Sequence, residues 1–424
     1  MSLEKTLNSE RIMVGKKVVV GSYEKYLKNR KTAQEGLDIN SLKQELISIK
    51  KYSIENLEEL KKKAIENIKK QNIQVYEAKT AVDARKILLK LIKRREKVVK
   101  SKSNVFNEIG VEKYLLKRNE LTETDCGDFI VQITGEKTAH PVTPAIHIPI
   151  EKILEVISKK YKKKLKKDPK EITNWVRDHI KRKILEADVG ITGANVISSD
   201  GGIFILENEG NISLVSRLPK KHIIVTSIDK IVPTTKDAIT ICKAAAIWGS
   251  GVPLPTYINV ISSVSRTADI QKELVWGMYG PREVHLILVD NKRTEMIKEG
   301  FRELLECINC GACLFPCPVY KNVLDEYGLH YFGGRGVGIT TFQEGLKEGF
   351  ERGMYYCTTC GACKENCPLD IDIPDVIRRL REKAVKNNLE TQVNQEMMDN
   401  VRTSGNPFGE DIKDGKLPDK LYCC

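Results

Sequence analysis

The stretch "CINCGACLFPCP" at residues 307–318 decides the fold of its part of the chain, because it holds four cysteines in one short loop. Nearly the same phrase, "CTTCGACKENCP", returns at residues 357–368. Both phrases follow the spacing C-x2-C-x2-C-x3-C-P, which is a ligand run of [4Fe–4S] clusters. Three thiolates at intervals of three residues can reach three corners of one cubane, whereas the extra residue and the proline carry the fourth thiolate away. The sequence therefore predicts two [4Fe–4S] clusters.

The fourth cysteine of each phrase is expected to bind the cluster of the other phrase, as it does in proteins with two such clusters. The first quartet is then Cys307, Cys310, Cys313 and Cys367, and the second quartet is Cys357, Cys360, Cys363 and Cys317. Two structural zinc sites are the alternative. Zinc sites usually pair two C-x2-C knuckles across a longer spacer, and this difference favours iron–sulfur clusters.

The composition is that of a globular protein with more than one domain. The chain has 424 residues, of which 41% are hydrophobic and 30% are charged, and this length exceeds one ordinary core. No apolar stretch approaches the roughly 18 residues of a membrane helix, and "MSLEKTLNSERIMVGKK" at the N-terminus has no apolar signal segment. We expect a cytoplasmic protein, in which clustered cysteines indicate metal rather than disulfides. Cys423 and Cys424 close the chain and are interpreted as tail residues.

The formal charge of +13 has its clearest concentration in "KKYKKKLKKDPK" at residues 159–170. Such a segment can bind nucleic acid, anionic lipid or an acidic partner. It contains one Tyr and one Leu, which is little of the aromatic interleaving that base stacking uses. A solvated helix end is therefore the favoured interpretation, and a nucleic-acid partner is not expected.

Short apolar runs alternate with helical patterns between about residues 70 and 295, and this alternation predicts an α/β domain with a largely parallel sheet. The strand candidates are 73–79, 97–101, 128–135, 202–207, 222–228 and 284–290. Residues 1–69 are predicted as a helical N-terminal extension, and residues 390–424 as a C-terminal tail. Residues 296–389 have helical patterns on both sides of each cysteine phrase, and the long spacer between the phrases favours an α-helical ferredoxin domain over the compact β-rich type.

Several phrases together resemble a known family. They are "KVVKSKSNVFNEIG" (97–110), "ETDCGDFIVQITGEKTAHPVTPAIH" (123–147), "EADVGITGAN" (186–195), "ENEGN" (207–211), "GPREVHLILVDN" (280–291) and "CINCGACLFPCPVY" (307–320). In this order and spacing they closely resemble the lactate-utilization iron–sulfur proteins, in which a LUD domain is fused to a two-cluster ferredoxin domain. The resemblance covers roughly residues 70–385.

The resemblance implies a LUD domain similar to the α/β fold of sugar-phosphate isomerases and CoA transferases. It also implies two [4Fe–4S] clusters and a place in a multi-subunit system that oxidises L-lactate to pyruvate. The implied partners are a cysteine-rich CCG-domain protein, a second LUD protein or a flavoprotein dehydrogenase subunit, with a possible flavin on the partner.

Candidate substrate-binding residues lie where strands of the α/β domain end, because α/β sheets bind ligands there. Asn195 and the turn Glu207, Asn208, Glu209 and Asn211 are such candidates, although turn and capping roles explain them equally well. Lys100 and Lys102 follow a strand and could hold a carboxylate. His147 and His222 lie beside apolar runs and are candidates too, with a buried core role as the alternative. No catalytic residue is predicted.

Three functions remain open from the sequence. The favoured one is an electron-transfer subunit of a 2-hydroxyacid oxidoreductase that passes electrons singly through two [4Fe–4S] clusters and is not catalytically complete alone. The second is the same role in another redox complex, such as a heterodisulfide-reductase-like assembly. The third is a non-catalytic iron–sulfur module that binds nucleic acid.

Overall fold

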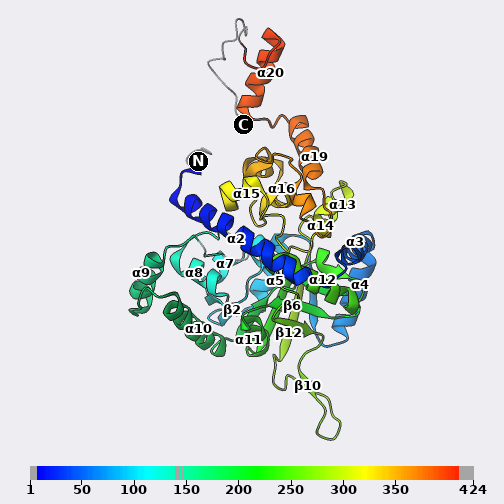
Figure 1. Cartoon of the computed structure of the whole chain (residues 1–424). Coiled ribbons are helices and arrows are strands. Elements are labelled where there is room, and N and C mark those ends of the chain that lie inside the picture. Colours follow the sequence, from blue (N-terminus) through cyan, green and yellow to red (C-terminus); the bar gives the residue numbers. More distant parts are fainter. Residues whose placement is uncertain (1–6, 139–143, 146, 410–424) are drawn as a thin grey trace.

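The computed structural model describes residues 7–138, 144–145 and 147–409, so Cys423 and Cys424 lie outside the described residues. Its centre is a six-stranded, fully parallel sheet in the order β1-β12-β7-β4-β2-β3 (Figure 1). The strands are β1 Gln74–Ala78, β2 Lys97–Lys100, β3 Glu120–Glu123, β4 Val189–Thr192, β7 Lys221–Ser227 and β12 Glu283–Val289. The predicted α/β domain with a largely parallel sheet is confirmed.

Burial explains why these segments are strands. The central strands β7 and β12 are buried at nearly every position, which is the pattern of parallel strands covered on both faces. One face packs on α5 Ala81–Leu91, α6 Asn104–Ile109 and α7 Glu112–Leu115. The other face packs on α4 Leu57–Lys69 and on a second sheet. The α/β core therefore includes a helix of the predicted N-terminal extension.

The predicted strand at residues 128–135 is wrong. This segment is the helix α8 Cys126–Thr134, which packs beside α9 Ile150–Tyr161 and α10 Pro169–Leu185. The side chain of Asp125 accepts a hydrogen bond from the Asp128 N–H at its start, and Gly135 ends it with a φ of 71°. A short apolar run has no decisive period, and here the capping residues at both ends outweighed its β propensity.

A second, four-stranded sheet has the order β8-β5-β6-β9. Its strands are β5 Val196–Ser198, β6 Ile203–Glu207, β8 Ile231–Val232 and β9 Tyr257–Ile261. The hairpin of β10 Arg266–Thr267 and β11 Val275–Trp276 projects away from the body of the molecule (Figure 1). In the chain, α11 Asn211–Arg217 follows β6, η1 Ile228–Lys230 follows β7, and α12 Thr235–Ser250 follows β8 and packs on β5 and β6.

The residues after β12 form short helices above the edge of the large sheet (Figure 1). They are α13 Arg293–Lys298, α14 Glu303–Glu306, α15 Pro318–Val323, η2 Leu324–Glu326, α16 Gly333–Gln343, α17 Leu346–Gly349, η3 Phe350–Met354, α18 Ala362–Glu365 and α19 Ile373–Lys386. The segment is predominantly helical, as predicted. A further helix, α20 Gln392–Ser404, lies within the predicted C-terminal tail.

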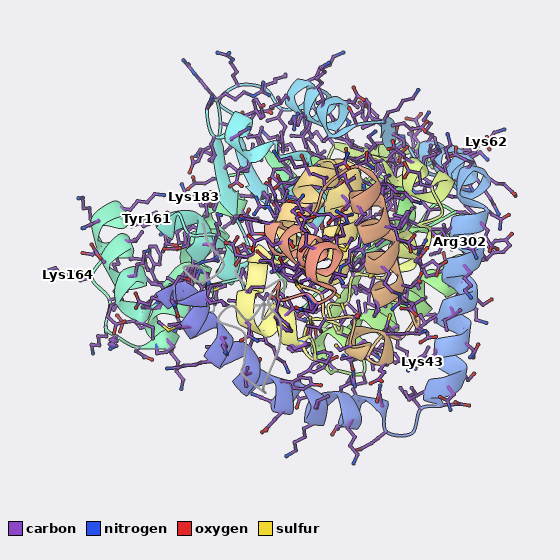
Figure 2. All side chains as sticks on the ribbon, turned by 90° about the horizontal axis from the view of Figure 1, so that it is seen from above. Lys43, Lys62, Tyr161, Lys164, Lys183 and Arg302 are labelled. Atoms are coloured by element: carbon purple, nitrogen blue, oxygen red, sulfur yellow. The ribbon has the colours of Figure 1, made fainter. Side chains whose placement is uncertain are left out.

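Two long N-terminal helices run along the outside of both parts (Figures 1 and 2). They are α2 Glu10–Gln34 and α3 Ile39–Glu55. In α2, the Tyr26 ring stacks on Phe315 of the first cysteine loop with 4.0 Å between centroids, and its hydroxyl donates to the Trp248 carbonyl at 2.6 Å. These contacts fix the first cysteine loop against α12.

The basic segment 159–170 lies on the periphery of the molecule, where the labelled Lys164 points outward (Figure 2). Two of its lysines form exposed ion pairs with the preceding helix, Lys159 with Glu155 and Lys167 with Glu151. This arrangement agrees with a solvated helix end. Among the described helices, none is long and apolar enough to cross a membrane.

Candidate functional site

The two cysteine loops share one backbone conformation. Asn309 and Thr359, which occupy equivalent positions, have φ angles of 56° and 52°, and Gly311 and Gly361 have φ angles of 78° and 84°. A positive φ angle is energetically unfavourable for residues other than glycine. The sequence has glycine at two of these four positions. No heavy atom lies within 4 Å of a Cβ built on either glycine. At both glycines the space beside the backbone is open.

The cysteines of the first quartet are electrostatic neighbours in the structure, and their assignment to one cluster stays a prediction. Burial raises the pKa of the Cys313 thiol, and the neighbouring thiolates of Cys307, Cys310 and Cys367 raise it further. Burial also raises the pKa of Cys310, with Cys307 and Cys367 as additional causes. The cysteine from the second phrase, Cys367, therefore lies among the first three cysteines of the first phrase.

The second quartet gathers in the same way. Cys317, Cys357, Cys360 and Cys363 all line one cavity of about 30 Å³. Burial raises the pKa of Cys363 to about 12, and the Cys317 and Cys357 thiolates contribute in the same direction. Cys317, from the first phrase, thus lies among three cysteines of the second phrase.

The thiols of each quartet fit a cubane in their chemistry and in their surroundings. Backbone N–H groups point at the sulfurs, from Asn309 to Cys307 Sγ at 3.3 Å and from Tyr320 to Cys317 Sγ at 3.4 Å, and such donors stabilise thiolate ligands and tune a cluster. In the described ranges, no three His, Cys, Asp or Glu side chains form a group that could hold one metal ion.

Two arginines hold the loops in place. Arg335 of α16 donates to the Leu304 carbonyl at 3.0 Å and to Asn309 Oδ1 at 2.7 Å in the first loop. Arg381 of α19 donates to the Cys357 carbonyl at 2.5 Å in the second loop. All three bonds are charge-assisted, so the side chains fix the backbone from which the cysteines project.

A cleft separates the first cysteine loop from the carboxyl edge of the large sheet. Its larger part has a volume of about 370 Å³, and its wall includes the loops after β2, β4 and β6, Lys230 after β7, and residues 308–311 of the cysteine loop. A second part of about 310 Å³ shares Lys102, Asn104, Asn309 and Tyr331 with the first and reaches Cys307 and Cys313. Such volumes suit a small ligand, and the carboxyl edge of a sheet is the usual place for one.

Six of the nine predicted substrate residues line this cleft, namely Lys102, Asn195, Glu207, Asn208, Glu209 and Asn211. Three of them already have structural hydrogen bonds. Asn195 accepts from the Leu206 N–H, and Asn208 accepts from the Thr256 N–H. Glu207 accepts from the Ser213 N–H and from Asn259 Nδ2. These bonds support the turn and capping roles that the sequence left open.

The other three predicted residues in the cleft make fewer or longer polar contacts. Glu209 accepts a long bond of 3.4 Å from the Cys126 N–H, and burial raises its pKa. Asn211 donates to Thr124 Oγ1 at 3.1 Å. Lys102 Nζ lies 3.5 Å from the Asp128 carboxylate. The side chain is 27% exposed, but its Nζ atom is inaccessible to solvent and has no hydrogen-bond partner among the described residues.

Three predicted residues lie apart from this cleft. Lys100 is buried and forms an ion pair with Glu123 on the neighbouring strand. His147 is buried near α2, and burial lowers its pKa. His222 lies at the start of β7, at the opposite end from the cleft, with Nε2 2.8 Å from Thr192 Oγ1. Burial lowers the pKa of His222 to about 3, so it is a neutral core residue at neutral pH.

Sequence reasoning missed a buried ionic network below the cleft. Arg293 Nη2 contacts Glu108 at 2.8 Å, and Arg293 Nε contacts Asp229 at 2.6 Å. The Tyr331 hydroxyl, from the helical part, donates to Glu108 at 2.8 Å. Arginine holds the pKa of both carboxyl groups below the usual range against the effect of burial. The network joins the α/β part to the cysteine-rich part.

Two buried lysines near the first quartet were also missed. Lys50 lies on α3 and Lys230 follows β7. A signal for Lys50 existed, because it is four residues from both Leu46 and Ile54 on the apolar face of a helix. Lys230 follows Asp229 inside the apolar run 222–232, and charges in such a run are buried at a cost unless they have partners.

Comparison with known proteins agrees with this geometry. Residues 61–289 match the LUD domain, and residues 303–371 match the 4Fe-4S dicluster domain. "Lactate utilization protein B" of Bacillus cytotoxicus is 33% identical over 343 residues, which are 80% of this chain and 70% of that protein. "Lactate utilization protein B 2" of Bacillus mycoides is 34% identical over the same shares. A solved structure of a DUF162 family protein from Deinococcus radiodurans covers 55% of this chain and 98% of its own, with 16% identity and a TM-score of 0.28.

Proposed function

Because the chain belongs to the lactate utilization protein B family, with a LUD domain followed by a 4Fe-4S dicluster domain, we propose that it is the iron–sulfur electron-transfer subunit of a multi-subunit oxidoreductase. The proposed reaction is oxidation of a 2-hydroxy acid, L-lactate to pyruvate. The observation that carries the proposal is the pair of crossed cysteine quartets, one of which borders a cleft of about 370 Å³. The names of the relatives support the choice of substrate.

The chemistry divides naturally between this chain and a partner. Oxidation of a 2-hydroxy acid to a 2-oxo acid removes two electrons and two protons, whereas a [4Fe–4S] cluster supplies one-electron transfer. A two-electron acceptor is therefore needed, and we propose a flavin on a partner subunit. The proposed partners are a cysteine-rich CCG-domain protein and a second LUD protein or flavoprotein subunit. The chain alone is not a complete catalyst in this proposal.

In this proposal, residues of this chain hold the two cysteine loops in position and orient their sulfurs. Arg335 and Arg381 hold the two loops, and the N–H groups of Asn309 and Tyr320 donate to cysteine sulfurs. The cleft is where a small molecule or a partner's cofactor can approach the first quartet, with Lys102 available for an acidic group. We propose a cytoplasmic location, which the free state of all described cysteines supports.

The test is anaerobic purification of the native complex from its own cells, followed by addition of L-lactate. We expect copurification of CCG-domain or flavoprotein subunits and a lactate-dependent electron paramagnetic resonance signal of reduced [4Fe–4S] clusters. A complex that contains the Cys317→Ala variant is the matched control, because it should keep only part of this signal. Clusters that dithionite reduces but lactate does not, in the intact complex, would discard lactate as the substrate. The identified partners would then indicate another redox complex.

A further inference from the structure

Positive charge is buried around one quartet far more than around the other. Among the described residues, five cationic side chains are buried, namely Lys50, Lys100, Lys230, Arg293 and Arg335. Lys100 pairs with Glu123 on the large sheet. Of the other four, Lys230 lines the cleft with residues 308–310 of the first cysteine loop, and Arg335 donates to Asn309 in that loop. Lys50 and Arg293 both contact Asp229, the residue before Lys230.

Lys50 lies on α3, which packs against α14, the helix that ends one residue before Cys307. Its side chain is 3% exposed, and Nζ donates to the Asp229 carbonyl at 2.6 Å. Its hydrogen-bond partner is therefore a neutral oxygen. Burial lowers the pKa of Lys50 to about 8, and the Asp229 and Cys307 charges oppose that shift.

Lys230 lies on the cleft side of the same loop. It lines the cleft together with Ile308, Asn309 and Cys310. Its Nζ is 3.9 Å from the Asp229 carboxylate. Arg293 Nε forms a closer ion pair with the same carboxylate, at 2.6 Å. The Cys307 thiolate also favours the charged form of Lys230.

The buried charges near the first quartet are balanced in number, so their positions decide the local potential. The cations are Lys50, Lys230, Arg293 and Arg335, and the buried carboxylates are Asp229, Glu108, Glu306 and Glu207. Arg293 forms close ion pairs with Glu108 and Asp229. In contrast, Lys50 donates to a carbonyl oxygen, and Lys230 Nζ lies 3.9 Å from its nearest carboxylate.

The second quartet has a different environment. Lys364, which follows Cys363, pairs with Asp372 at 2.9 Å, and its side chain is 39% exposed. Arg381 is half-buried, and its guanidinium donates to the carbonyls of Met354 and Cys357. Water screens such exposed charges, whereas it screens buried ones much less. The two quartets therefore experience unequal potentials.

We propose that Lys50 and Lys230 hold the reduction potential of the cluster in the first quartet above that of the cluster in the second quartet. A nearby fixed positive charge stabilises the added electron, so the first electron that enters the pair rests on the cluster beside the cleft. This inference goes beyond the proposed function, since it requires neither lactate nor a partner subunit.

The test is a potentiometric titration of the anaerobically purified full chain, with dithionite, mediators and electron paramagnetic resonance at each potential. The parent protein should show two separate one-electron steps. Lys230→Gln should lower the upper step and leave the lower one in place. At separations of about 10 Å and an effective dielectric constant of about 20, the equilibrium between the clusters should change about tenfold, which is about 59 mV for one electron.

Three further variants make the result decisive. Lys230→Arg keeps the charge and should keep the upper step, and Lys364→Gln, beside the second quartet but exposed, should move neither step. Lys50→Met should lower the same step as Lys230→Gln. Selective loss of the first cluster from both charge-removing variants, with recovery in Lys230→Arg and Lys50→Arg, would also support the proposal.

Lys230→Gln protein with a full iron content and two unchanged potentials would overturn the proposal. A shift confined to the lower step would overturn it as well, and so would cluster loss that the arginine variants do not repair. None of these results depends on lactate oxidation. A failure of the proposed substrate and a failure of this inference are therefore distinguishable.

Discussion

Pairs of cysteine substitutions test directly whether the two quartets are crossed. Each quartet takes three thiols from one phrase and one from the other, so the structure predicts which pairs of substitutions act on one cluster. Replacing Cys317 with Ala removes a wall of the cavity that Cys357, Cys360 and Cys363 also line. The full chain should hold about eight irons in two clusters, and Cys317→Ala should reduce this to about four.

Double substitutions then give opposite expectations for crossed and uncrossed ligation. Cys317→Ala with Cys363→Ala changes one quartet, so the chain should still hold about four irons. Cys317→Ala with Cys313→Ala changes both quartets, although the two residues lie in the same phrase, and iron should fall to near zero. Iron and sulfide analysis of anaerobically purified protein, with the electron paramagnetic resonance spin count, measures both. About four irons after the Cys313 and Cys317 double substitution, and near zero after the other, would refute the crossed assignment.

Two further predictions concern the buried network of Arg293, Glu108 and Asp229. Arg293→Met should destabilise the protein by about 3–5 kcal/mol in urea unfolding, because it leaves two buried carboxylates without their cation, and a loss below about 1 kcal/mol would contradict this role. The pKa values of Glu108 and Asp229 are depressed in the folded protein, so their contribution is complete above about pH 4 and is lost as the pH falls through the folded values. The difference in stability between the parent protein and Arg293→Met should therefore shrink as the pH falls below about 4, and a difference that stays constant down to about pH 2 would disprove the linkage.

The two cysteine loops were predictable from the sequence for a physical reason. Ligand spacing within a short loop leaves few geometries, whereas the grouping of Cys317 with Cys363 joins two phrases and stays a prediction that rests on proteins with two clusters. The parallel sheet was predictable for a similar reason, since β7 and β12 are long apolar runs that only two-sided burial explains. The segment 128–135 failed because its apolar run is too short to show a period, and only the caps at Asp125 and Gly135 decide it.

The cleft was predictable only in part. Residues at strand ends could be selected because the sheet topology brings them to one edge, and Asn195 and Asn211 do lie there. The opposite wall could not be predicted, because it depends on how the cysteine loop docks on that edge. His222 was misleading, since its position at the start of β7 places it at the far end of the strand. The direction of a strand, rather than the residue type, decides which polar side chains face a ligand.

The docking of the parts of the chain on one another gathers buried charge at the first cysteine loop. Lys50 comes from the N-terminal helices, Lys230 and Arg293 come from the α/β part, and Arg335 and Tyr331 come from the helical part. Gly249 of α12 allows the close approach of the loop, since a Cβ there would lie 2.9 Å from the Cys310 carbonyl oxygen. A cysteine-rich part separated from the rest of the chain would lose Lys50, Lys230 and Arg293, which are three of these four buried cations. The N-terminal helices and the α/β part therefore shape the electrostatic environment of cysteines that only the helical part carries.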